Sequence, residues 1–334
     1  MTAAGGPPTA RRTGPSRLSG QLRFGALLWT ERASWQELLD AAIAAEEAGF
    51  SSIWCSDHLV ASTGPPEGSC FELWTTLAAI GTRTSTATIG PLVAAVALRN
   101  PGVTTKAVTT LDHITGGRAV LGLGSGWLRR EYESYGIPFG DSAALRAQRL
   151  EEGIEIIRGL LAGETVSCHS EYYEITGAKQ SPRPIQAKVP LLIGGQGPRL
   201  LPVVARHADM WNARGGAGEI APAAAALRSH CERLGRPYDE IERLTNRWVC
   251  IGASRPDAAR SLTSSLARHG IADYNPGIVA LGSPEEVADQ LAPTVRAGFN
   301  HIICSLRSPF DYETINRFHQ VAEILAGCNA VASC

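Results

Sequence analysis

The stretch Arg23–His58, RFGALLWTERASWQELLDAAIAAEEAGFSSIWCSDH, holds the pattern that decides the fold. It opens on a short apolar run that is typical of a β-strand. Ser34, with Glu37 three residues later, forms a capping-box pattern, which predicts a helix that Gly49 ends. A second short apolar run follows that glycine. A strand, a helix and a second strand in this order predict a βαβ unit with parallel strands.

The same alternation continues along the chain. We expect eight strands, at residues 23–28, 52–56, 87–92, 119–122, 191–193, 210–212, 246–251 and 301–305. Eight such units in 334 residues favour an α/β fold of the closed (β/α)8 type, a TIM barrel, over an open doubly wound sheet.

One stretch interrupts the alternation after the fourth unit. Val166–Ile175 alternates polar and apolar residues, which predicts a strand or hairpin inserted at about residues 164–189. We therefore expect one barrel domain over residues 21–327. Residues 1–20, rich in Ala, Gly, Pro, Thr and Arg, should form a disordered tail, and residues 328–334 a C-terminal tail.

Composition excludes several classes of function. The chain has 31 Lys and Arg against 32 Asp and Glu, so no basic excess indicates a nucleic acid or a membrane surface as partner. Apolar runs are far shorter than the roughly 20 residues that span a bilayer. The 8 Cys form no Cys-x-x-Cys pair and no Cys–His cluster with zinc-ligand spacing. We therefore expect no metal site and a cytoplasmic protein that acts on a small molecule.

Asp57-His58 is the best candidate for chemistry in the residues themselves. In such barrels the active site lies at the C-terminal ends of the strands, and this pair follows the second expected strand. Histidine titrates near neutral pH, and a neighbouring carboxylate can orient it or raise its pKa. The plainer alternative is that Asp57 caps the next element and His58 bonds a loop carbonyl.

Gly122, Gly124 and Gly126 alternate after the fourth expected strand. A dinucleotide fingerprint would need a further glycine two positions after Ser125, where Trp127 stands, and an acidic residue about 20 positions on. We expect the glycines to admit a flat ligand or to allow positive φ.

A second glycine-rich loop, Gly194–Gly197, precedes a helix expected from Pro198. Loop amides and a helix start favour a phosphate, although an ordinary turn would look the same. Trp29 and Trp127 follow strands, so they stack on a planar ligand at the mouth or simply pack in the core.

Taken together, these strand-end segments resemble the luciferase-like monooxygenase superfamily, and within it the oxidoreductases that depend on the deazaflavin coenzyme F420. The resemblance runs from about Gln21 to Leu325. It rests on IWCSDH (53–58), ELWTTL (72–77), RNP (99–101), TLDHITGGR (110–118), GLGSGW (122–127), Glu131, YG (135–136), RLEE (149–152), Tyr173, PRP (182–184), IGG (193–195) and ARHADMWN (205–212).

The resemblance implies a flavin-like ring in the barrel mouth. His58 would serve as proton donor or acceptor, with Asp57 orienting it, and a non-prolyl cis peptide is expected near Pro91-Leu92, behind the ring. The implied cofactor-binding residues are Asp57, His58, Pro91, Leu92, Val93, Ala94, Gly124, Ser125, Gly126, Gly194, Gly195, Gln196 and Gly197. The implied substrate pocket contains Trp29, Trp127 and Asn212.

The implied reaction is hydride transfer from reduced F420 to a C=C, C=N or C=O of a secondary metabolite or other small organic molecule. Sugar-phosphate dehydrogenases of this family carry a Glu where Trp127 stands, so a sugar phosphate is not expected. Two alternatives stay open: an FMN-dependent two-component monooxygenase and a barrel that binds a flavin-like ligand without catalysis. Relatives are commonly homodimers, so we expect a homodimer.

Overall fold

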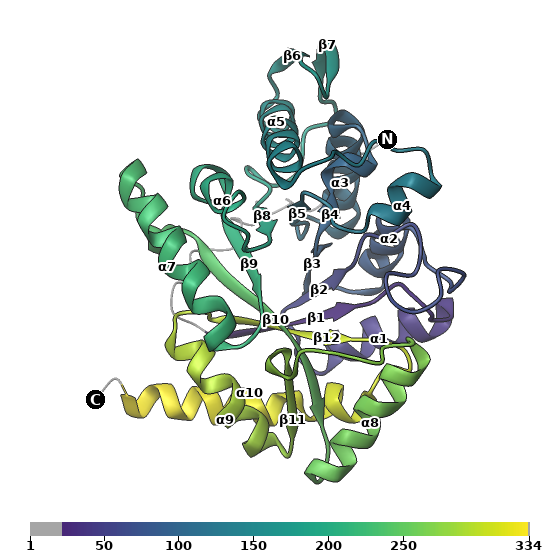
Figure 1. Ribbon diagram of the computed structural model, residues 1–334, viewed down its shortest axis with the longest axis vertical. Coiled ribbons are helices and arrows are strands. Elements are labelled where there is room, and N and C mark those ends of the chain that lie inside the picture. Colours follow the sequence, from purple (N-terminus) through teal and green to yellow (C-terminus); the bar gives the residue numbers. More distant parts are fainter. Residues whose placement is uncertain (1–21, 333–334) are drawn as a thin grey trace, which may run out of the picture.

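The computed structural model describes residues 22–332 and shows a nearly closed barrel of parallel strands wrapped by helices (Figure 1). The sheet order is β3-β2-β1-β12-β10-β9-β8-β5-β4, with β11 paired to the end of β10. A bridge between Ile89 and Ala119 joins β3 to the start of β5 and brings the two edges of the sheet together. The barrel strands are β1 (Arg23–Leu28), β2 (Ser52–Cys55), β3 (Thr88–Pro91), β4 (Ala94–Ala95), β5 (Leu121–Gly124), β8 (Leu191–Gly194), β9 (Met210–Arg214), β10 (Glu242–Ile251), β11 (Val279–Gly282) and β12 (His301–Leu306).

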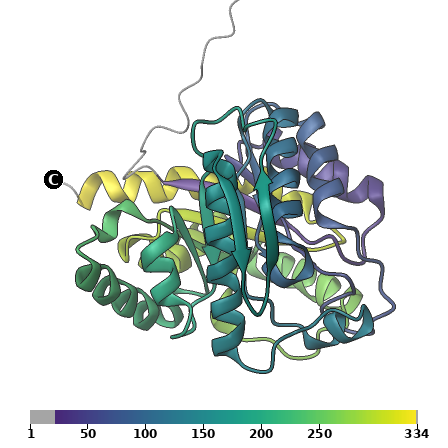
Figure 2. The same cartoon turned by 90° about the horizontal axis from the view of Figure 1, so that it is seen from above.

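Helices cover the outside of the barrel (Figures 1 and 2). They are α1 (Trp35–Glu47), α2 (Leu73–Arg83), α3 (Pro101–Thr115), α4 (Arg129–Ser134), α5 (Ala143–Ala162), α6 (Leu201–His207), α7 (Ala217–Leu234), α8 (Arg255–Arg268), α9 (Pro284–Arg296) and α10 (Tyr312–Ala332). Short 3-10 turns cover Val96–Leu98, Tyr238–Glu240 and Pro276–Ile278. No helix in residues 22–332 is long and apolar enough to cross a bilayer.

The first βαβ unit forms as its sequence predicts. The Ser34 hydroxyl accepts from the Glu37 amide, and the Glu37 carboxylate accepts from the Ser34 amide, so both halves of the capping box are present. Gly49 leaves the helix with φ of 91°, which a residue with a Cβ rarely adopts. This unit places the end of β2, and hence Asp57-His58, at the barrel mouth.

The inside of the barrel is packed and is not a pore. Side chains from six strands, from the residue after β3 and from the residue before β5 fill it: Leu27, Trp54, Leu92, Val120, Leu192, Met210, Leu244 and Ile303. A chain of hydrogen bonds closes the end of the barrel at which the strands begin. There His301 bonds both the Ser52 hydroxyl, at 2.9 Å, and the Glu242 carboxylate, at 2.8 Å. The open end is therefore the one formed by the C-terminal ends of the strands.

The expected barrel is confirmed, with two short strands added. The two added strands, β4 of two residues and β11 of four, were not predicted. The inserted hairpin is present as antiparallel β6 (Thr165–His169) and β7 (Glu174–Lys179). Helix α10 extends to Ala332, so the C-terminal tail expected from residue 328 is helical over most of its length. The expected tail at residues 1–20 lies outside the described residues.

Candidate active site at the barrel mouth

Asp57 is held away from His58 by an arginine. Its carboxylate accepts two bonds from the Arg99 guanidinium, at 2.7 and 3.0 Å, and one from the Ala95 amide at 3.0 Å. Burial raises the pKa of Asp57, and the bonds from Arg99 and Ala95 oppose that rise. The carboxylate therefore ties β2 to the segment after β3. No hydrogen bond joins Asp57 to His58 among the described residues, and Asp57 acts on the ring through its charge, which helps to raise the pKa of His58; that Asp57 orients His58 stays a prediction.

Glu131 makes the hydrogen bond to the His58 ring. Its Oε2 lies 3.1 Å from Nδ1 of His58 and also accepts from the Leu59 amide at 3.0 Å. Glu131 is 1% exposed, so the pair is shielded from water. Burial disfavours the imidazolium, but the bond and charge of Glu131 outweigh it and raise the pKa of His58. The sequence analysis quoted Glu131 only as part of a motif, because it lies 73 positions from His58 and on another element.

The segment after β3 carries a non-prolyl cis peptide, between Leu92 and Val93. The sequence analysis placed it one residue earlier, at Pro91-Leu92. The Val93 side chain fills a notch made by glycines of β5 and β8: a Cβ on Gly124 would lie 2.6 Å from Val93 Cγ2, and one on Gly194 would lie 2.8 Å from Val93 Cγ1. Gly124 therefore admits Val93.

Gly126 and Gly195 are the glycines here that need positive φ. Gly126 has φ of 76° and turns the chain between Ser125 and Trp127. Gly195, with φ of 125°, starts the loop after β8, and its carbonyl accepts from the Trp211 indole at 2.8 Å. Both glycines shape the mouth by backbone conformation. Of the alternating glycines Gly122, Gly124 and Gly126, positive φ is found at Gly126.

The loop Gly194–Gly197 runs directly into a turn and then into α6. Leu200 and Leu201 both donate to the Gly197 carbonyl, and a Cβ on Gly197 would meet no atom within 4 Å. Gln196 turns back across the loop, and its Oε1 accepts from the Arg214 amide at 2.7 Å. The open face at Gly197 leaves room for a ligand.

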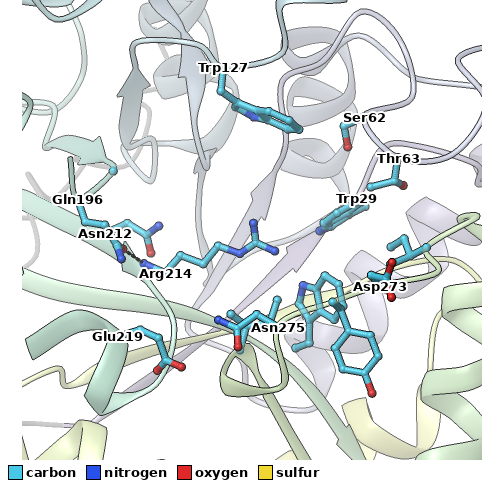
Figure 3. Close-up of a pocket in the computed structure, with 15 residues that line it drawn as sticks. Trp29, Ser62, Thr63, Trp127, Gln196, Asn212, Arg214, Glu219, Asp273 and Asn275 are labelled. Carbon is cyan, nitrogen blue, oxygen red and sulfur yellow. Dashed lines mark hydrogen bonds between the residues drawn. The ribbon is translucent and has the colours of Figure 1, made fainter. Parts of the chain in front are cut away.

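A cavity of about 660 Å³ opens at this end of the barrel (Figure 3). Five predicted residues line it: Trp29, Trp127, Gly195, Gln196 and Asn212. The structure adds Ser62, Thr63, Arg214, Glu219, Trp248, Ile271, Asp273, Tyr274, Asn275 and Ile278, none of which the sequence analysis singled out. The loop before β11 supplies several of these, and no motif of the sequence marked it.

His58 borders this cavity through Trp127. The two rings meet edge to face with centroids 5.6 Å apart, and Trp127 is 63% exposed. Asp57, Pro91, Leu92, Val93, Ala94, Gly124, Ser125, Gly126, Gly194 and Gly197 do not line the cavity itself. They build the neighbouring wall, in which the cis peptide and the glycine notch lie.

The residues present fit a flat ligand with a polar edge. Aromatic rings of Trp29, Trp127 and Trp248 form broad apolar walls. Asn212 donates to Asn246 at 3.1 Å, but its own Oδ1 is buried without a hydrogen-bond partner. Such an oxygen accepts readily from a ligand, because leaving it unpaired is costly. Among residues 22–327 no group of His, Cys, Asp and Glu side chains is placed to hold a metal ion.

Known proteins are similar to this chain in sequence and in fold. An F420-dependent glucose-6-phosphate dehydrogenase of Nakamurella multipartita is 30% identical over 316 residues, covering 84% of this chain and 90% of that protein. One of Microbacterium testaceum, also 30% identical, covers 84% and 90%. In fold, the F420-dependent tetrahydromethanopterin reductase of Methanopyrus kandleri superposes with a TM-score of 0.78 at 21% identity, covering 92% of this chain and all of that one.

The family model described as luciferase-like monooxygenase matches residues 14–278. That match covers well over half of the chain, and the fold is shared with the solved structure above. The chain therefore belongs to the luciferase-like monooxygenase family.

Proposed function

We propose that the protein is an oxidoreductase that depends on coenzyme F420 and reduces a C=C, C=N or C=O bond of a small organic molecule. The observation that carries this proposal is the buried His58–Glu131 pair beside an aromatic-walled cavity. The similarity to F420-dependent enzymes supports the choice of cofactor. When bound, the reduced coenzyme would supply a hydride.

The cofactor would lie against the wall made by the cis peptide and the glycine notch. Val93 and its neighbours Leu92 and Ala94 would support the ring, and backbone at Gly124–Gly126 would border it. The loop Gly194–Gly197, open at Gly197, would take the phosphate. The Asp57–Arg99 pair holds that wall in place, because Asp57 also bonds the Ala95 amide.

His58 would hold or move the proton that balances hydride transfer. Glu131 fixes its Nδ1, so Nε2 is the ring nitrogen left for exchange with the ligand or with water. The raised pKa keeps the imidazolium available near neutral pH, as a proton donor requires. Trp29, Trp127 and Asn212 would position the substrate at the cavity side.

A sugar phosphate is not the substrate that this cavity favours. The chain has three Lys, at positions 106, 179 and 188, and none of them lines the cavity, whose described lining holds one basic residue, Arg214, beside two acidic ones, Glu219 and Asp273. Three tryptophans line it instead, and rings of that size favour a flat, largely apolar molecule. We therefore propose an activated, conjugated substrate.

The first experiment measures binding of F420 and of FMN to the apoprotein by calorimetry. Micromolar binding of F420 with much weaker binding of FMN supports the proposal. The reverse preference, with oxygen uptake when reduced FMN and substrate are added, would instead indicate a two-component monooxygenase. Tight binding without turnover across a broad panel of reducible compounds would indicate a barrel that binds its ligand without catalysis.

The second experiment compares His58→Ala with His319→Ala, an exposed histidine on α10. His58→Ala should keep F420 affinity within about tenfold and lose about 10²–10⁴ in the rate of reduced-F420 oxidation. The His319 variant should match the wild type. Equal turnover in both variants would remove His58 from proton transfer.

We also propose a homodimer. Val103 and Ile114 of α3 are 57% and 39% exposed, which leaves apolar surface on this helix. Light scattering coupled to size exclusion tests the assembly, and a monomer at micromolar concentration would contradict it.

A further inference from the structure

Two arginines converge on one tryptophan at the cavity wall. Arg214 ends β9 and Arg307 follows β12, so they come from opposite sides of β10. The guanidinium carbon of Arg307 lies 3.6 Å from the ring centroid of Trp248, and that of Arg214 lies 5.8 Å from it. Arg307 also lies 4.9 Å from the centroid of Trp29. Both rings line the cavity, so Arg307 packs directly behind its wall.

Neither arginine has an anionic partner. No carboxylate of residues 22–327 forms an ion pair with Arg214 or Arg307. Arg307 is 5% exposed, and its Nε and Nη1 are enclosed without hydrogen-bond partners. Burial lowers the pKa of Arg307 to about 10, so the side chain is still charged at neutral pH. A buried charge is costly unless it is paired, and aromatic faces compensate it only in part.

A third donor lies in the same wall. The indole Nε1 of Trp248 is buried without an acceptor. The structure thus holds unpaired donors and excess positive charge around one ring, on the cavity side away from the glycine notch. In Figure 3 the Arg214 side chain extends into the cavity toward Trp29.

The remaining lining limits the charge of the ligand. Glu219 and Asp273 also border the cavity and would repel a dianion such as a phosphate monoester. Trp29, Trp127 and Tyr274 offer flat apolar surface to the rest of the molecule. A planar monoanion meets both conditions, and a guanidinium binds a carboxylate through two parallel hydrogen bonds.

We propose that Arg307 and Arg214 form a carboxylate-binding subsite, and that the substrate is a planar, conjugated or aromatic carboxylate whose ring system stacks on the cavity tryptophans. This inference rests on the proposed function, because it names the substrate class of that same site. Arg307 is the fixed element, held between Trp29 and Trp248. Arg214 is the more accessible element and closes over the bound anion.

The test uses two probes of the same shape, cinnamate and the neutral cinnamyl alcohol, titrated by calorimetry into protein saturated with its cofactor. The wild type should bind cinnamate at least tenfold more tightly than the alcohol. Arg307→Gln and Arg214→Gln should each weaken cinnamate binding at least tenfold and change the affinity for the alcohol less than threefold. Arg228→Gln is the matched control, since it removes a guanidinium 4.3 Å from the ring of Tyr238, away from the cavity.

A wild type that does not prefer cinnamate, or folded Arg307→Gln and Arg214→Gln variants that keep full cinnamate affinity, would overturn the proposal. If Arg307→Gln fails to fold, the test uses Arg307→Lys and Arg214→Gln. Arg307→Lys keeps the buried charge but removes the bidentate donor, and Arg214→Gln changes the more exposed of the two arginines. Loss of cofactor affinity in both glutamine variants would instead assign the arginines to the cofactor's own anionic groups. Failure of the wild type to bind either F420 or FMN would refute the proposed function, and cinnamate binding to the same apoprotein would still report on the arginines.

Discussion

Nδ1 of His58 lies 3.1 Å from Oε2 of Glu131, a carboxylate that is 1% exposed and that also bonds the Leu59 amide. One oxygen thus fixes both the ring and the backbone that carries the next residue. The hydrogen bond to the His58 ring thus comes from Glu131, whereas the neighbouring Asp57 is hydrogen-bonded to Arg99.

Glu131→Gln should lower the pKa of His58, because it removes an opposite charge at bonding distance. Titration of the His58 ring by NMR on the apoprotein measures the shift without a substrate. Glu133→Gln, on the exposed side of α4, should leave it unchanged. An unaltered titration in Glu131→Gln would show that the pair is not coupled.

The same pair sets the sign of a pH effect on stability. The folded pKa of His58 is raised above its ordinary 6.5, so the imidazolium stabilises the fold fully below about pH 6.5 and loses this effect as the pH rises through the folded pKa. The difference in free energy of unfolding between wild type and His58→Gln should therefore be larger at pH 6 than at pH 9. A constant difference over that range would contradict it.

Gly122→Ala should destabilise the protein strongly. A Cβ there would collide with the backbone carbonyl oxygen of Pro91, which cannot rotate away, and we expect a loss of about 3 kcal/mol or more. Gly197→Ala is the control, because its Cβ would meet nothing within 4 Å. Urea unfolding measures both. Equal stability of the two variants would mean that β3 and β5 are not in contact at this point.

Features that depend on residues close together in the chain could be predicted from the sequence. The capping box at Ser34 and the break at Gly49 depend on residues close in the chain, so both were predicted correctly. A flat ligand or positive φ was expected at the glycines after the fourth strand, but the neighbour of Gly124 is Val93, from the segment between β3 and β4. Close approach and positive φ call for the same residue, and the sequence alone does not separate them.

Partners from distant elements escaped prediction. Glu131 reaches His58 from the loop and helix after β5, and Arg307 reaches Trp248 from the end of β12. Nothing in either segment specifies its partner, because the barrel closure brings the strand ends together. Acidic and basic residues just after barrel strands, taken as a set, are the signal that could have marked them.

Glu46→Gln should weaken the junction between α1 and β3. Burial works against ionisation, yet bonds from the amides of Ala87, Thr86 and Ser85 lower the pKa of Glu46 to about 2. A lowered carboxyl pKa stabilises the fold above about pH 4.5, and this effect is lost as the pH falls toward 2. The variant should lose about 1–2 kcal/mol at pH 7. At pH 3 the difference in free energy of unfolding between Glu46→Gln and wild type should be smaller than at pH 7. An equal difference at both pH values would show that the Glu46 carboxylate does not stabilise this junction.

We expect His269, which packs against the cavity residue Trp29, to make the stability of the protein sensitive to acid. Its ring is fully buried, meets Trp29 edge to face at 5.8 Å between centroids, and bonds the Ser308 carbonyl through Nε2 at 2.9 Å. Burial, together with the charge of Arg307, lowers the pKa of His269 to about 4. The neutral ring is therefore compatible with the fold above about pH 6.5, and stability is lost as the pH falls from there toward 4.

Replacing this histidine should flatten that loss. Urea unfolding of His269→Gln at pH 7.5 and 4.5 should show a smaller drop in the free energy of unfolding than the wild type shows, even if the variant is less stable at both. His319→Gln, which changes an exposed histidine, should keep the wild-type drop. If the drop in His269→Gln equals that of the wild type, the acid sensitivity arises elsewhere. If the drop in His269→Gln is smaller, protonation of His269 is a source of the acid sensitivity. The imidazolium would then lie close to the charge of Arg307, and neither side chain forms an ion pair with a carboxylate of the described residues.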